Sequence, residues 1–291
     1  MTGSNARDLK ESSERFPGRR GQGRDISLFP LGPHQLGSLE CFKGLPERDL
    51  LEVYLKVGGF PPAIRDYVES GVVTDRTFET YKNWIVGDAA RFGMSGEILR
   101  HVCARVFDTL SSRITWPRLI ESTPVKSHET ALKYVEHLED ALLCKVHFCY
   151  DERRGGPAEN KARKLYFIDP LLYYLAYSWK RGLTNVWSSV LDLAGNAQFR
   201  GGLLESVYVT CTSRYRWPTY FWYSTKTQKE ADLVLEGPDA LLVFDFKASR
   251  PPVRKVLDKQ VTILGPDDCI AFLRSASEHP PPSRIVSKAP D

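Results

Sequence analysis

Apolar residues recur at helical spacing through the first part of the chain. A helix is expected from Glu47, because apolar positions follow three and four residues apart: Leu50, Leu51, Tyr54 and Leu55. Gly58-Gly59-Phe60-Pro61-Pro62 ends this run, since glycine and proline interrupt helices. The same spacing predicts further helices over residues 63–70, 76–92 and 97–110. Residues 46–110 are therefore expected to form a helical region.

Residues 111–168 predict a short helix over 116–121, then a longer helix and two strands. The longer helix follows Ser127, whose hydroxyl is expected to cap its N-terminus. Its apolar face contains Ala131, Tyr134, Val135, Leu138 and Leu142. Strands are expected over 143–150 and 165–168, with a charged, glycine-containing loop between them. This order of elements is typical of a winged helix.

The last third of the chain contains alternating apolar positions. A helical connector is expected over 169–198, and the composition changes at Phe199. From there we expect a helix over 202–213, strands over 219–223, 230–235 and 240–247, a helix over 252–263 and a strand over 269–273. The tail 275–291 is rich in proline and serine and is expected to be disordered. The sequence thus predicts an α/β (α+β) protein, with a mixed central sheet within residues 199–274.

Composition and charge narrow the function classes. The 291 residues are 42% hydrophobic, which is enough to bury cores and excludes a wholly disordered chain. Forty Lys and Arg against 36 Asp and Glu give a net charge of +4, which permits nucleic-acid binding without indicating it. The longest apolar stretches are too short to span a bilayer, and no secretory signal is visible. We therefore expect a cytoplasmic protein without a membrane partner.

The six cysteines are spread along the chain with no CxxC spacing, which favours reduced, buried thiols. One group contains residue types that bind zinc: His137, Cys144, His147 and Cys149. In a strand, Cys144 and Cys149 would face opposite ways. Ordinary packing is therefore the preferred interpretation of this group.

The strongest candidate for chemistry combines three acidic residues and a lysine. Asp245 and Lys247 are two apart on a predicted strand and so share one face. Asp232 lies at a similar point on the neighbouring strand, and Glu205 lies on the preceding helix. Carboxylates that meet at one point repel each other unless a cation neutralises them, and Mg²⁺ prefers oxygen ligands. A metal-bound water, with a lysine nearby, can hydrolyse a phosphodiester. The alternative is a salt-bridged cluster at a sheet edge.

These residues resemble the motif of the PD-(D/E)XK, or restriction-endonuclease-like, superfamily: Glu205 on a helix, Asp232 on a strand, then Asp245-Phe246-Lys247. The resemblance implies a nuclease-like domain over residues 199–274. It also implies that Asp232 and Asp245 bind Mg²⁺ or Mn²⁺, that Glu205 supports them, and that Lys247 orients the attacking water.

The wider chain resembles the C-terminal part of a prokaryotic family of AAA+-type ATPases that carry a winged helix and an endonuclease-like domain of uncharacterised function. The resemblance covers about residues 45–273. It rests on segments in one order: Gly58-Gly59-Phe60-Pro61, residues 122–142, Lys164-Leu165-Tyr166-Phe167-Ile168-Asp169, Leu203-Leu204-Glu205, Tyr220-Phe221-Trp222-Tyr223, Glu230-Ala231-Asp232 and Asp245-Phe246-Lys247.

Residues 1–45 are expected to be either a remnant of the ATPase core or a flexible leader. Ser4 and Asn5 resemble the sensor-1 strand end of such ATPases, Arg19 lies in a stretch like their arginine-bearing turn, and residues 26–31 resemble the last strand of the core. No GxxxxGK[ST] motif occurs in the chain, so ATP hydrolysis is not expected without a partner. The chain therefore resembles a truncated member, one that has lost or been separated from most of its nucleotide-binding domain.

Two basic groups are candidates for phosphate contacts with DNA. Arg153, Arg154 and Lys164 lie in or beside the expected wing loop. Lys255 and Lys259 are four apart on the helix expected over 252–263 and would share a face. Solvated charged surfaces are the alternative for both groups.

Two function hypotheses follow from the sequence. In the first, the chain is a Mg²⁺-dependent nuclease-like protein that acts on DNA through Glu205, Asp232, Asp245 and Lys247. In the second, it is a non-catalytic module that binds DNA or a protein partner, for example a separately encoded ATPase half.

Overall fold

The computed structural model describes residues 27–121, 123–215, 217–237, 241–247 and 255–279. Ser4, Asn5 and Arg19, the predicted nucleotide-site remnant, lie outside this range. Residues 27–31 form no strand, in contrast to the prediction. The Leu31 N–H instead donates to the carbonyl of Gly59 at 2.9 Å, which holds this segment against the following helices.

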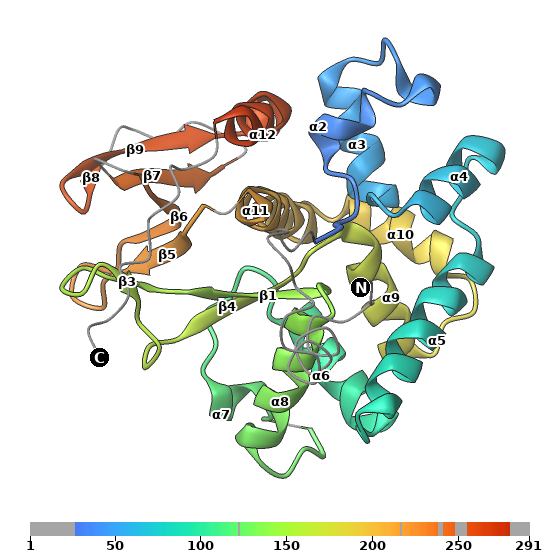
Figure 1. Ribbon diagram of the computed structural model, residues 1–291, viewed down its shortest axis with the longest axis horizontal. Coiled ribbons are helices and arrows are strands. Elements are labelled where there is room, and N and C mark those ends of the chain that lie inside the picture. The colour runs from blue at the N-terminus through green and yellow to red at the C-terminus, as the bar shows by residue number, and fades with distance from the viewer. Residues whose placement is uncertain (1–26, 122, 216, 238–240, 248–254, 280–291) are drawn as a thin grey trace, which may run out of the picture.

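The predicted helical region is confirmed. Its helices are α3 (Glu47–Val57), α4 (Pro61–Ser70), α5 (Asp75–Arg91) and α6 (Gly96–Asp108). The short helix α2 (Pro33–Leu36) and the 3₁₀ turn η1 (Glu40–Phe42) precede this region. In Figure 1, α4 and α5 form the right-hand side of the molecule, next to α9 and α10. The buried residues of α3 include Leu50, Leu51, Tyr54 and Leu55, as the helical spacing predicts.

The next segment has the predicted order of elements. It contains α7 (Trp116–Leu119), α8 (His128–Asp140), β1 (Cys144–Phe148), β2 (Tyr150–Asp151), β3 (Gly156–Pro157) and β4 (Arg163–Phe167). Ser127 caps α8, because its hydroxyl accepts from the Thr130 N–H at 3.2 Å. Strands β1 and β4 pair antiparallel, and β2 and β3 form a short hairpin of their own. The winged-helix interpretation of this order stays a prediction.

The C-terminal part contains a five-stranded sheet. Three helices lead into it: α9 (Pro170–Arg181), α10 (Val186–Gly195) and α11 (Ala197–Arg214). The sheet order is β5 (Thr219–Tyr223), β6 (Glu230–Glu236), β7 (Leu241–Phe246), β9 (Lys259–Leu264) and β8 (Lys255–Val256). Strands β7 and β9 are parallel and the other neighbours antiparallel. The protein is therefore α/β with a mixed sheet, as predicted.

Two predicted elements of this part are wrong. Residues 255–263 form β8 and most of β9 instead of a helix. Val256, Val261 and Ile263 pack on one face of the sheet. Leu257 and Asp258, both at positive φ, make the tight turn between the two strands. Residues 269–273 begin α12 (Cys269–Glu278), which follows the 3₁₀ turn η2 (Pro266–Asp268), instead of forming a strand. The buried residues of α12 have helical spacing and are Cys269, Ile270, Leu273 and Ala276. Residues 275–278, which were expected to be disordered, belong to this helix.

Helix α11 lies at the centre of the molecule, between the five-stranded sheet and the helical region (Figure 1). Its residues 202–212 are all buried, and the ring of Tyr208 stacks on Phe246 of β7 with centroids 4.2 Å apart. The main hydrophobic cluster extends from Leu36 in α2 to Leu273 in α12. The predicted units thus share one core around this helix. None of the described helices is long and apolar enough to cross a membrane.

Candidate functional site: a lysine-centred carboxylate cluster

Three carboxylates surround the ammonium group of Lys164. Lys164 Nζ lies 2.7 Å from Glu205 Oε1, 2.7 Å from Glu230 Oε1 and 3.5 Å from Asp232 Oδ1. The side chain of Lys164 is only 1% exposed. We call Lys164, Glu205, Glu230 and Asp232 the lysine-centred cluster. It joins three elements, since Lys164 comes from β4, Glu205 from α11 and the other two acids from β6.

Strand β4 and helix α11 position the buried half of this cluster. Lys164 and Tyr166 are two apart on β4 and therefore point to the same side. Both reach Glu205 Oε1, the tyrosine hydroxyl donating at 2.5 Å. Glu205 lies on the buried stretch of α11, between Leu204 and Ser206, so its carboxylate depends on these two donors.

A β-bulge orients Asp232. Tyr220 pairs with Val234 and Trp222 with Ala231, so two residues of β6, Asp232 and Leu233, lie opposite one residue of β5. Both Ala231 and Val234 belong to the second hydrophobic cluster, on the face of the sheet away from α11. Because of this extra residue, the side chain of Asp232 points to the face of the sheet that packs against α11, where it meets Lys164. Its other oxygen, Oδ2, accepts from the Phe246 N–H at 3.0 Å.

The electrostatics of the cluster favour a charged lysine. Burial alone would lower the pKa of Lys164, but Glu205, Asp232 and Glu230 outweigh it and raise that pKa above its ordinary value. Burial raises the pKa of Glu205, although Lys164 and Tyr166 oppose the shift. A second cation, the guanidinium of Arg113, lies 3.3 Å from Glu230 Oε2. Lys164 therefore acts as an internal counter-ion for acids that would otherwise repel each other.

His147 lies beside the cluster as a neutral side chain. It pairs with Lys164 across β1 and β4, and its Nε2 lies 3.3 Å from the carbonyl of Asp232. Burial and then the charge of Lys164 lower the pKa of His147 to about 3. Its ring lies beside Tyr166 and Phe221. Among the described residues, no three His, Cys, Asp or Glu form a metal-binding group.

Asp245 and Lys247 do not join the cluster in the way the motif implies. Asp245 is 1% exposed and shares a strand face with Val243, which belongs to the second hydrophobic cluster. Its neighbours Phe244 and Phe246 face the other way, against Phe272 of α12 and Tyr208 of α11. Lys247 directly follows β7 and is exposed, and its backbone N–H donates to the carbonyl of Leu264. The structure thus brings Glu205 and Asp232 together and places Asp245 on the opposite face of the sheet.

This arrangement does not fit a magnesium or manganese ion held by Asp232 and Asp245. The two side chains leave opposite faces of the sheet, and Asp232 already binds Lys164 and the Phe246 N–H. The distances of 2.7–3.5 Å from Lys164 Nζ to the three acids suit an ammonium, whereas Mg²⁺ takes oxygens at about 2.0–2.1 Å. The lysine thus occupies the centre where the superfamily resemblance expects a metal.

The predicted nucleic-acid residues divide into buried and exposed ones. Lys164 is a correction: it lies inside β4 and is buried among acids, so it cannot contact phosphates from a loop. Arg153 and Arg154 are exposed in the β2–β3 turn, where their N–H groups donate to Asp151. Lys255 and Lys259 are also exposed, but on the β8–β9 hairpin instead of a helix.

The sequence reasoning missed Lys164, Glu230, Tyr166 and Arg113 as members of this site. One signal for Lys164 was present, since a lysine and a tyrosine two apart, alternating with Leu165 and Phe167, indicate a polar partner on one face of the strand. Nothing local in the sequence shows that this partner is Glu205, 41 residues away.

Comparison with known proteins gives one match. A family model described as "Domain of unknown function (DUF8612)" matches residues 48–181, less than half of the chain. This segment runs from α3 to the end of α9 and includes Lys164, whereas Glu205, Glu230 and Asp232 lie beyond it. Searches of curated proteins and of solved structures found no match. The comparisons therefore assign no activity to the chain.

Proposed function

We propose that this chain is related to the C-terminal part of AAA+-type ATPases, and that its endonuclease-like half binds DNA without cleaving it. One observation carries the non-catalytic part of this proposal: the ammonium of Lys164 lies at the centre of Glu205, Glu230 and Asp232. A metal-dependent nuclease needs such carboxylates for its ion. Here they neutralise a buried lysine that belongs to the fold.

The retained order of elements supports the family relationship. Helix α11 with Glu205 is followed by β5, by β6 with Asp232 and by β7 with Asp245, as the endonuclease-like resemblance expects. A shared framework does not imply shared chemistry, because function depends on the site. The bulge at Asp232 and the buried Lys164 are the features that distinguish this site from a metal centre.

Two exposed hairpins support DNA binding. The β2–β3 hairpin carries Arg153 and Arg154, and the β8–β9 hairpin carries Lys255 and Lys259. Tyr150 of β2 and Val256 of β8 both belong to the second hydrophobic cluster. Figure 1 shows both hairpins at the left edge of the molecule. Side chains of this kind contact phosphates without reading sequence, and such binding weakens as salt rises.

The experiment is to incubate the purified protein with single-stranded and duplex DNA in Mg²⁺ or Mn²⁺, and to measure cleavage and binding together. We expect intact DNA and salt-sensitive binding. The double variants Arg153→Gln/Arg154→Gln and Lys255→Gln/Lys259→Gln should each weaken binding, whereas Lys43→Gln/Arg48→Gln, on the exposed surface before and within α3, should not. Cleavage that Asp232→Asn abolishes would refute the non-catalytic assignment.

A second candidate function, pairing with a separately encoded ATPase half, rests on Leu28. Its side chain is 87% exposed, in the segment that resembles the last strand of an ATPase core. Phe29 next to it lies under the guanidinium of Arg214, so the segment is held against the molecule. This candidate would be supported if a polypeptide with Walker motifs co-purifies with the wild type and no longer does so with Leu28→Asp. Retention of that polypeptide by the variant would refute the role of Leu28.

A further inference from the structure

A cavity of about 440 Å³ lies between α4 and the first turns of α5. Pro62 and Arg65 of α4 line it together with Arg76, Thr80 and Tyr81 of α5. Its volume is within the range of small-molecule sites in proteins. It is separate from the lysine-centred cluster and lies within the segment that the family model matches.

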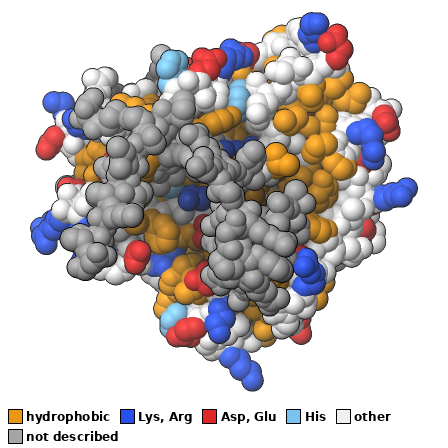
Figure 2. Space-filling view, in the orientation of Figure 1, with side chains coloured by type: hydrophobic (Ala, Val, Ile, Leu, Met, Phe, Trp, Pro, Cys, Tyr) orange, Lys and Arg blue, Asp and Glu red, His pale blue; other side chains and the backbone are white. Residues whose placement is uncertain are grey.

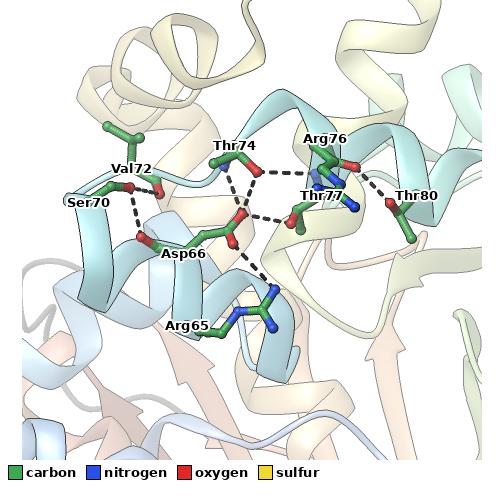
Figure 3. A network of polar contacts seen from close by, with 8 residues as sticks. All are labelled: Arg65, Asp66, Ser70, Val72, Thr74, Arg76, Thr77 and Thr80. Atoms are coloured by element: carbon green, nitrogen blue, oxygen red, sulfur yellow. Dashed lines mark hydrogen bonds and ion pairs between the residues drawn. The ribbon is translucent and has the colours of Figure 1, made fainter.

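Asp66, which lines this cavity, is the centre of a polar network (Figure 3). Asp66 Oδ2 accepts from the Thr74 N–H at 3.1 Å, the Thr74 hydroxyl at 2.6 Å and the Thr77 hydroxyl at 2.7 Å. Burial raises the pKa of Asp66, but these hydrogen bonds together outweigh it and hold the pKa below its ordinary value. The carboxylate is thus charged, and its Oδ2 is occupied by these three donors, which leaves recognition of a ligand to the arginines.

The rim carries two guanidinium groups. Arg65 Nη2 lies 3.9 Å from Asp66 Oδ1, at the limit of an ion pair, and is largely exposed. Arg76 forms no ion pair within the described part of the chain and is also exposed. With a single engaged carboxylate below them, the two arginines leave excess positive charge at the mouth. Arginine binds phosphate in bidentate geometry, and the N-terminus of α5 adds partial positive charge.

Tyr81 and Pro62, which also line the cavity, offer contact to an organic group. Tyr81 packs against Phe60 with ring centroids 4.6 Å apart, and burial raises the pKa of its hydroxyl to about 12, so the phenol is neutral. Pro62 lines the same cavity. A ligand with a charged head and a flat or apolar body would therefore match both the arginines and these two residues.

We propose that this cavity binds a phosphate monoester, with the phosphate between Arg65 and Arg76 and the organic part against Tyr81 and Pro62. The group could come from a free nucleoside monophosphate or from the 5′-phosphate end of a nucleic-acid strand. This inference is independent of the DNA-binding proposal above, which concerns the hairpins on the sheet. The two can therefore fail separately.

The test is calorimetric titration of the full chain with inorganic phosphate, deoxyadenosine monophosphate, and a short oligonucleotide with either a 5′-phosphate or a 5′-hydroxyl. Arg65→Gln and Arg76→Gln should each weaken phosphate-ester binding by about tenfold. Arg48→Gln, an exposed arginine on α3, is the matched control and should bind as the wild type does. Circular dichroism would establish that the variants are folded, which is expected because both arginines are exposed.

The outcomes separate the sources. Binding of the mononucleotide points to a free ligand, and binding of only the 5′-phosphorylated strand points to a nucleic-acid end. Absence of saturable binding by every phosphate probe would overturn the proposal. So would unchanged affinity in both arginine variants, or acetate binding as tightly as inorganic phosphate.

Discussion

Asp169 Oδ2 accepts a hydrogen bond from the backbone N–H of Gly59 at 2.8 Å, across 110 residues of sequence. The other oxygen, Oδ1, accepts from the Leu171 N–H at 2.9 Å and so caps α9. One carboxylate therefore fixes the Gly58-Gly59 turn to the start of α9. The geometry of this turn and the protonation of Asp169 both have measurable consequences.

Gly58→Ala should destabilise the protein by more than about 2 kcal/mol. Gly58 has φ 78° and ψ −169°, a conformation that is open essentially only to glycine. A Cβ atom there would also lie against Asp169 Oδ1. Gly71→Ala is the control, because Gly71 also has a positive φ, 75°, but the space around it is open. We expect this variant to lose only about 1 kcal/mol of stability. Urea unfolding of both variants measures the difference, and equal losses would contradict the steric argument.

Asp169 should make stability fall as the pH rises from about 4 to 6. Burial raises the pKa of its carboxyl from 3.8 to about 6, against the hydrogen bonds from Gly59 and Leu171. The folded state then holds a proton that the unfolded state has released, so the contribution is complete below pH 4 and is lost through pH 6. Within this window, the free energy of unfolding of the wild type should fall by roughly 1.4 kcal/mol per pH unit relative to that of Asp169→Asn. Parallel stability curves for the two proteins would exclude the shift.

His147 should have the opposite effect from Asp169 and make stability fall as the pH drops. In the folded state the pKa of His147 is about 3, below its ordinary value of 6.5. Between these two values the unfolded state therefore binds a proton that the folded state does not bind. Stability is therefore lost as the pH falls from 6.5 towards 3. His147→Phe, which keeps a ring between Tyr166 and Phe221, should remove this acid sensitivity. Thermal melting at pH 7, 5.5 and 4.5 tests it, and an unchanged difference between variant and wild type would count against a buried neutral histidine.

Lys164→Met should cost about 3–5 kcal/mol at neutral pH, because it leaves Glu205, Glu230 and Asp232 without their shared cation. The loss should shrink as the pH falls, because burial raises the pKa of Glu205 and its protonation relieves the repulsion. Mn²⁺ should stabilise this variant more than the wild type, since the lysine no longer fills the centre. Lys161→Met, at an exposed lysine nearby, should change stability little. If Lys164→Met melts like the wild type at every pH, Lys164 is not the counter-ion of these acids.

Patterns local in sequence predicted most of the elements. The helices around Leu50, Leu51 and Tyr54, the Ser127 cap and the strands around Asp232 and Asp245 follow from spacing within a few residues. The β8–β9 hairpin lies in the stretch 252–263, which the sequence predicts as a helix. The alternation of Val261 and Ile263 with polar residues decided the structure instead.

The candidate site could be predicted only in part. Glu205 and Asp232 come together as expected, but the bulge that orients Asp232 depends on the pairing of β5 with β6 and leaves no local signal. The burial of Lys164 depends on how β4 packs against α11, which is likewise a property of the tertiary structure. The motif Asp245-x-Lys247 correctly places Asp245 on a strand, whereas Lys247 follows the end of β7. A position on the strand alone does not bring the side chain of Asp245 to the cluster.

The lysine-centred cluster also limits how this protein can be divided experimentally. A fragment ending at residue 181, the boundary of the matched family model, would keep Lys164 and lack every carboxylate that neutralises it. Such a fragment would also lose α11, against which β4 packs. Recombinant work on either portion should therefore begin with both expressed together.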